Sequence, residues 1–139
     1  MPYAINDDAL RAAVRRGVRV QLLIVDWDLT PNRLPSLRSL ASFPGVEIRV
    51  VHIPGAPTGP IPYARVIHTK VMTVDGATTW IGTSNREGGY LDCSGNLEIV
   101  LRSRKMADRL DRLQDQTWTS PYAQGLEAAI AERQARSRS

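Results

Sequence analysis

Three side chains of complementary chemistry lie close together in the middle of the chain: the imidazole of His68, the ammonium of Lys70 and the carboxamide of Asn85. They stand in two apolar, β-branched runs, HTKVMTVD over 68–75 and IGTSN over 81–85, where polar residues are otherwise costly. An imidazole can act as a nucleophile or base, and a fixed cation and neutral donors can stabilise charge on non-bridging oxygens. The pattern therefore indicates a site that binds and attacks a phosphodiester.

The offsets predict how two neighbouring strands present these groups. His68 and Lys70 are two residues apart, so on a strand their side chains project from the same face. Thr83 and Asn85 share the same offset near the end of the next strand. Between the two runs, Asp75 is followed by glycine, which is a strong signal for a hairpin turn. We therefore expect a strand–turn–strand unit that places Thr83 and Asn85 beside His68 and Lys70.

Glu98 lies on a later apolar stretch. An unpaired buried carboxylate would be expensive, so we interpret Glu98 as a group that orients an imidazole by accepting from its second ring nitrogen. Two aromatic residues, Trp27 and Tyr63, could stack on bases or line a substrate groove, although packing at the core or its rim is the default for such residues. Asp26 and Asp28 follow a predicted strand, where capping of the next helix is commoner than metal binding.

The elements around the site begin with a βαβ pattern. The sequence predicts an amphipathic helix over 6–16, a strand over 18–25, a helix over 30–43 and a strand over 46–53. Strand, helix and strand in this order imply parallel pairing. Four prolines and two glycines make residues 54–62 a loop.

The second part of the chain is predicted to form short strands followed by helices. The expected strands and helices are, in order, strands over 65–68, 70–74, 78–83 and 96–101, and helices over 103–118 and 124–134. The fold class is therefore α/β, a mixed β-sheet flanked by helices.

Composition bounds the possible classes of protein only loosely. The chain has 139 residues, one domain's worth, and 42% hydrophobic content fits a soluble globular protein. Its formal charge is +4, but Arg133, Arg136 and Arg138 supply three of these charges from a tail that we expect to be frayed. Net charge therefore supports a polyanionic partner only weakly.

Other classes have little support in the sequence. Cys93 is the single cysteine and cannot form an internal disulfide. No apolar run reaches the length of a membrane span, and the N-terminus lacks the basic and hydrophobic regions of a signal peptide. No cluster has the spacing of a metal site, so we expect neither a metal nor a cofactor. The compartment is left open.

The residues from His68 to Asn85 resemble a known motif. His68-x-Lys70-x4-Asp75 followed by Gly82-Thr83-x-Asn85 resembles the HKD motif of the phospholipase D superfamily. The runs IPYAR over 61–65, IGTSN over 81–85 and TSPY over 119–122 are similar to the C-terminal half of the branch that contains lysosomal 5′-exonucleases.

This resemblance extends from Ile5 to Tyr122. It implies a phospholipase D-like half-domain over 1–122 that lacks its first strand, and a helical, basic tail over 123–139.

The resemblance implies a role for each matching residue. His68 would be the nucleophile that forms a phosphohistidine, or else the acid–base histidine. Lys70 and Asn85 would bind phosphate oxygens, and Thr83 would hydrogen-bond nearby. Glu98 would orient His68. Asp75, also of the motif, would be more a structural residue than a base, and no metal would be needed.

The family uses two HKD motifs in one site, and this chain holds one. The other histidine, His52, is followed by Ile53-Pro54 and has no matching lysine. We therefore expect either a homodimer or the C-terminal half of a longer enzyme, and the helical opening of the chain favours the latter. The expected substrate is a phosphodiester, single-stranded nucleic acid rather than phospholipid. The alternatives are a phospholipid hydrolase or phosphatidyltransferase, and an inactive half-domain that binds a partner.

Overall fold

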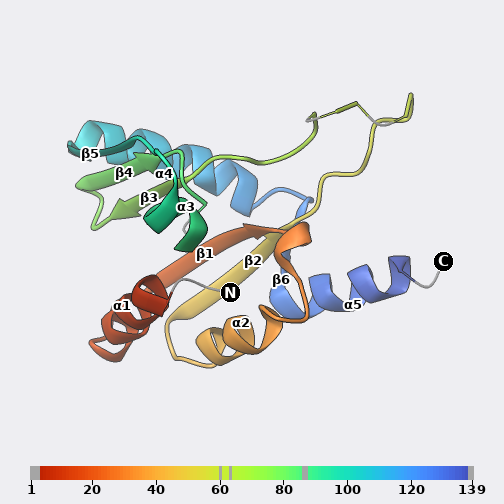
Figure 1. The fold of residues 1–139 in the computed structure, drawn as a ribbon, viewed down its shortest axis with the longest axis horizontal. Coiled ribbons are helices and arrows are strands. Elements are labelled where there is room, and N and C mark those ends of the chain that lie inside the picture. The colour runs from red at the N-terminus through yellow and green to blue at the C-terminus, as the bar shows by residue number, and fades with distance from the viewer. Residues whose placement is uncertain (1–3, 60, 63, 86–87, 138–139) are drawn as a thin grey trace.

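The computed structural model describes residues 4–59, 61–62, 64–85 and 88–137, which form two small sheets flanked by helices (Figure 1). The helices and strands are α1 (Ala4–Arg15), β1 (Val20–Val25), the 3-10 turn η1 (Asp26–Asp28), α2 (Leu34–Ala41), β2 (Val46–Val51), β3 (Val71–Val74), β4 (Thr78–Gly82), α3 (Gly88–Cys93), β5 (Glu98–Arg102), α4 (Arg104–Trp118), β6 (Ala123–Gly125) and α5 (Leu126–Arg136).

The first sheet has the strand order β1-β2-β6. β1 and β2 pair in parallel, from Val20 opposite Val46 to Val25 opposite Val51, and α2 forms the crossover between them. The predicted βαβ unit is thus confirmed. β6 pairs antiparallel with the other edge of β2, so β2, the strand with the most buried residues, is central.

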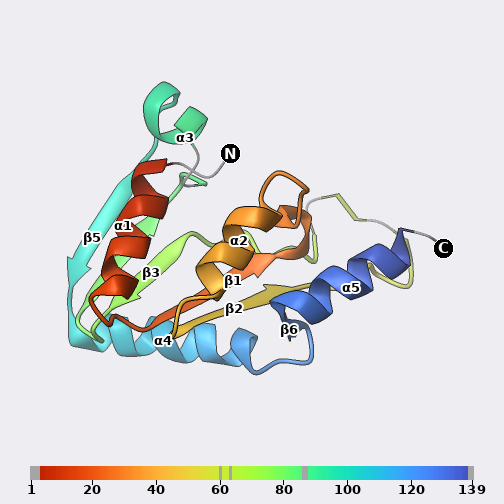
Figure 2. The same ribbon diagram turned by 90° about the horizontal axis from the view of Figure 1, so that it is seen from below.

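The main hydrophobic core lies between this sheet and two helices, α2 and α5, which Figure 2 shows side by side. Ile48 and Val50 alternate along β2 and point into this core, as a two-residue strand period requires. The buried residues of the cluster are Leu29, Leu40, Ile48, Val50, Leu126, Ala129 and Ile130.

The C-terminal segment beyond residue 122 packs into this core, whereas the domain boundary at residue 122 stays a prediction. β6 completes the sheet, and α5 buries Leu126, Ala129 and Ile130, which helical spacing places on one face. Arg133 donates to the backbone oxygen of Asp26 at 2.6 Å, so that part of the segment is not frayed. Arg138 lies outside the described residues.

The second sheet is antiparallel with the order β3-β4-β5, and α4 packs on one of its faces. Ala107 of α4 is fully buried, and Asp111 accepts a hydrogen bond of 2.5 Å from Thr73 Oγ1 of β3. The side chain of Ser103 accepts from the backbone N–H of Met106 and caps α4. α4 then continues toward β6, so it connects the two sheets (Figure 2).

Several local predictions differ from the structure. Residues 65–68 do not form a strand, because Arg65 has a positive φ of 57°, which interrupts an extended chain. The short helix α3 was not predicted, since glycine is a poor helix former. Asp28 pairs with Arg33 and caps no helix, and α2 begins later than expected, at Leu34.

The position of α5 in the core predicts a stability effect. Ile130→Ala should lower the free energy of unfolding by about 2–5 kcal/mol, because it leaves a cavity beneath β2. Urea unfolding monitored by circular dichroism measures this. Leu113→Ala, at a 55% exposed site on α4, is the control and should change stability by less than about 0.5 kcal/mol. Equal effects of the two substitutions would show that α5 is not part of the core.

Candidate active site

The register of the second sheet brings Lys70 and Glu98 to either side of Gly82. Gly82 pairs with Glu98 across β4 and β5. On its other side the N–H of Gly82 donates to the backbone oxygen of Lys70 at 3.0 Å, which extends the β3–β4 pairing by one residue. Residues that oppose each other across a sheet share a face. Lys70, Gly82 and Glu98 therefore form one row on the face opposite α4.

Gly82 leaves room for the carboxylate of Glu98. A Cβ at this position would lie 2.7 Å from Glu98 Cδ and 2.5 Å from Cζ2 of Trp80, which is closer than real side chains approach. The carboxylate thus lies directly over the glycine backbone. A larger residue would displace both Glu98 and Trp80.

Glu98 accepts a hydrogen bond from the hydroxyl of Ser84, which is completely buried. Ser84 was not singled out from the sequence, although its place between Thr83 and Asn85 in the motif could have drawn attention to it. The structure shows no hydrogen bond between Glu98 and the ring of His68 among the described residues. The proposed orienting role of Glu98 therefore stays a prediction.

The side chain of Lys70 contacts the backbone of His68. Lys70 Nζ donates to the carbonyl oxygen of His68 at 3.0 Å, while the side chain of His68 is exposed. Partial burial lowers the pKa of Lys70, because the ammonium loses hydration and pairs with no carboxylate in the part of the chain that the structure describes. The arrangement leaves an incompletely hydrated cation beside an accessible imidazole.

Thr83 and Asn85 lie at the same end of the sheet as Lys70. Thr83 Oγ1 donates to the side-chain oxygen of Asn96 and accepts from the N–H of Leu97, each at 3.1 Å. These bonds hold the end of β4 against the segment that leads into β5. Asn85 is exposed just beyond this point, so its carboxamide is available to a ligand.

Asp75 lies at the opposite end of the β3–β4 hairpin. Asp75 and Gly76 have φ values of 53° and 56°, and the N–H of Ala77 donates to the oxygen of Val74 at 3.1 Å. Positive φ at both central positions defines a type I′ turn, which favours Asp-Gly. The structure thus separates Asp75 from the other predicted site residues by the length of β3, and a catalytic role for it stays a prediction.

The described part of the chain contains no group of three or more His, Cys, Asp and Glu residues arranged to hold a metal ion. Within the same residues, no helix combines the length and the apolar character needed to cross a membrane.

Comparison with known families identifies the class of protein. Residues 2–118 match the family model described as "Cardiolipin synthase, PLD-like domain". The chain therefore belongs to the phospholipase D superfamily, and the resemblance of its HKD motif is confirmed at the level of the family.

The relatives include both phospholipase D and exonuclease names. Phospholipase D Z of Dictyostelium discoideum is 34% identical over 124 residues, which cover 87% of this chain and 29% of that protein. The 5′-3′ exonuclease PLD3 of Bos taurus is 35% identical over 137 residues, covering 91% of this chain and 28% of that protein. The chain thus spans less than a third of the curated relatives it matches.

A solved structure confirms the predicted fold class. NucT from Helicobacter pylori superposes with a TM-score of 0.77 at 13% identity, over 91% of this chain and 77% of that one. At this identity the similarity shows the fold alone.

The space over Gly82 predicts a strong effect of one added methyl group. Gly82→Ala should lower kcat/KM on a phosphodiester by at least about tenfold, because it displaces Glu98 and disturbs the row that includes Lys70. Steady-state kinetics measures this on the protein that holds both HKD motifs, either the homodimer or the longer enzyme, which is called the active assembly below. Gly125→Ala is the matched control, since a Cβ added at this strand glycine would meet nothing within 4 Å. Equal rates for the two variants would contradict the role of Gly82.

The lowered pKa of Lys70 predicts a shift in the pH profile. The predicted role of Lys70 in binding phosphate would need the protonated ammonium, so under that prediction kcat/KM should fall on the alkaline side at a lower pH than a fully hydrated lysine would give. Lys70→Arg should move this alkaline limb to higher pH, whatever its absolute rate, because arginine stays charged. Alkaline limbs that coincide for the wild type and Lys70→Arg would show that Lys70 does not cause the fall in kcat/KM.

Proposed function

We propose that this chain supplies one half of a phosphodiesterase site that cleaves single-stranded nucleic acid through a phosphohistidine. The observation that carries the proposal is the row Lys70–Gly82–Glu98, with the exposed His68 and Asn85 at its end. A cation, an imidazole and neutral donors at one sheet end are the groups that phosphoryl transfer requires.

The proposed reaction has two displacements. A ring nitrogen of His68 attacks phosphorus, so that a P–N bond forms and a P–O ester bond breaks. The leaving oxygen takes a proton from a histidine of the second HKD half. Water then attacks the phosphohistidine and gives a proton to that same histidine, which releases the phosphate monoester and restores His68. With the roles exchanged, His68 would be the acid and base, and the other histidine the nucleophile.

The other site residues would stabilise the transition state. Lys70 and Asn85 would contact the non-bridging oxygens, where negative charge increases during attack. Thr83 would keep the end of β4 in place through its bonds to Asn96 and Leu97. Glu98 would accept from His68 once the two halves and the substrate are in place.

Two observations support a second HKD half. The chain matches less than a third of the length of each curated relative. The remaining length of those relatives is enough to hold a second HKD half. The sheet face that carries Lys70 also exposes Met72, Val74 and Val100. Apolar side chains gathered on one sheet face are typical of a surface that another body covers. The second half would be either a linked domain or a dimer mate.

The preference for nucleic acid over lipid rests on the similar proteins. Several relatives are named 5′-3′ exonuclease PLD3 or PLD4. The names of other relatives, phospholipase D Z and Y, favour a phospholipid substrate instead. Phospholipid hydrolysis is therefore the second candidate.

Single substitutions test this function. In the presence of EDTA, the active assembly should cleave 5′-hydroxyl single-stranded DNA, and His68→Ala should reduce the rate by about a thousandfold or more. Lys70→Ala should also cause a large loss, whereas Lys105→Ala, at the other lysine of the chain, is exposed on α4 and should leave the rate unchanged.

Substrate comparison and mass measurement complete the test. Faster cleavage of phosphatidylcholine vesicles than of DNA would favour the lipid candidate. Retention of the rate by His68→Ala would refute the proposed mechanism. A fully active protein that light scattering shows to be a monomer with one HKD motif would refute the need for a second half.

A further inference from the structure

A second group of functional side chains lies at the carboxyl ends of β1 and β2. A cavity of about 250 Å³ opens there, between the strand ends and the segment 61–67 that leads to His68. Its described lining includes Asp26, Trp27, His52 and Arg65. Ligands of α/β sheets commonly bind outside the carboxyl ends of parallel strands.

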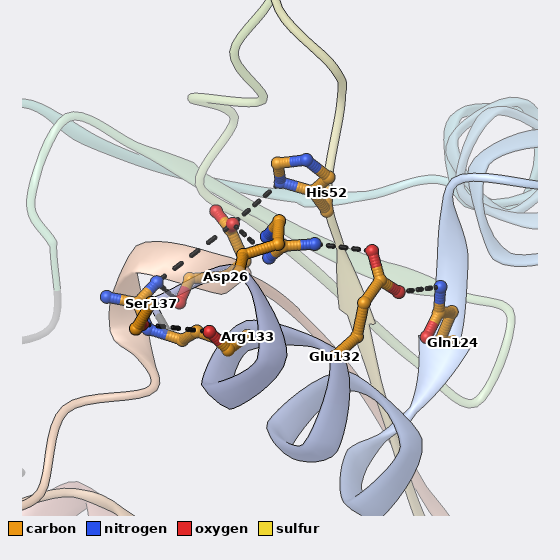
Figure 3. A network of polar contacts seen from close by, with 7 residues as sticks. Asp26, His52, Gln124, Glu132, Arg133 and Ser137 are labelled. Carbon is orange, nitrogen blue, oxygen red and sulfur yellow. Dashed lines mark hydrogen bonds and ion pairs between the residues drawn. The ribbon is translucent and has the colours of Figure 1, made fainter. Parts of the chain in front are cut away.

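The polar wall of the cavity is an Asp–His pair. His52 Nδ1 lies 2.7 Å from Asp26 Oδ2 (Figure 3). The backbone N–H of His52 donates to the oxygen of Tyr122 at 3.0 Å. The Asp26 contact orients the ring, and the backbone bond anchors the main chain of His52. Its Nε2 has no hydrogen-bond partner among the described residues, so it is available to a ligand.

The end of α5 holds Asp26 from the other side. Arg133 donates to the backbone oxygen of Asp26 at 2.6 Å, and Arg136 Nη2 lies 3.3 Å from Asp26 Oδ2. Figure 3 shows Asp26 between the ring of His52 and this helix. The carboxylate therefore contacts two separate segments, His52 after β2 and Arg136 of α5, and it acts as a positioning residue for His52.

The rest of the lining is apolar or aromatic except for the charged Arg65. Trp27 lies in η1, directly after β1, and is 48% exposed, so part of its indole ring is accessible from solvent. Arg65 lines the same cavity and donates from Nε to the oxygen of Pro54 at 2.6 Å. A partly exposed indole, an oriented imidazole and a guanidinium in one cavity suit a flat aromatic ligand with polar edges.

We propose that this cavity is a nucleobase-binding subsite, in which Trp27 stacks on a base and His52, positioned by Asp26, hydrogen-bonds its edge. The inference rests on the proposed function, because the base would belong to the single-stranded nucleic acid cleaved at His68. The lining segment ends at Ile67, one residue before His68, so a strand bound in the cavity leads toward the HKD residues. An acyl chain has no polar group that could hydrogen-bond to the Asp26–His52 pair.

Binding to intact and abasic strands tests the subsite. The active assembly with His68→Ala is used to prevent turnover, and fluorescence anisotropy measures its affinity for single-stranded oligothymidylate and for an abasic strand of equal length. Adding Trp27→Ala should weaken oligothymidylate binding by about tenfold or more and leave abasic binding unchanged. Trp27→Phe should keep most of the affinity, and His52→Ala should lose several-fold for oligothymidylate alone. Leu113→Ala, an exposed apolar site on α4, should have no effect.

The outcomes separate the inference from the proposed function. Unchanged oligothymidylate binding by Trp27→Ala, or an equal loss for the abasic strand, would overturn the subsite even if the parent protein cleaves DNA. Failure of the parent to bind or cleave DNA, together with cleavage of phospholipid vesicles, would overturn the proposed function and the subsite with it.

Discussion

The absence of a side chain at Gly82 is the constraint on which the site depends. The antiparallel register places Lys70 on one side of this glycine and Glu98 on the other, and the carboxylate occupies the space that a Cβ would need. Ser84 then holds the carboxylate through its buried hydroxyl. A cation and an anion are thereby kept on one face without direct neutralisation of each other, beside the exposed imidazole of His68.

The two sheets have different tasks. The sheet β1-β2-β6 holds the main core with α2 and α5, whereas the sheet β3-β4-β5 carries the HKD residues and leaves the face with Met72, Val74 and Val100 exposed. α4 connects the two. Stability therefore comes chiefly from one sheet and proposed chemistry from the other, with the Asp26–His52 pair at the end of the first sheet facing the segment that leads to the second.

Local patterns in the sequence sufficed to predict the βαβ unit, the hairpin at Asp75 and the helix over 103–118, because turn chemistry and hydrophobic periodicity act over a few residues. The cluster of His68, Lys70 and Asn85 could be predicted from motif spacing. Two features could not be predicted: the burial of α5, which depends on contacts with β2, and the Asp26–His52 pair. Both arise from residues far apart in the chain, which only the folded topology brings together.

The most direct test of the central claim uses the two histidines of the chain as probes. Nitrogen-15 NMR of their rings, assigned with a His52→Gln variant, would follow titration of the active assembly with inorganic phosphate. Phosphate held by Lys70 and Asn85 should shift the ring signals of His68 and leave those of His52 in place. A shift at His52 alone, or no shift at His68 at saturating phosphate, would contradict the assignment of the phosphate site to the end of the β3-β4-β5 sheet.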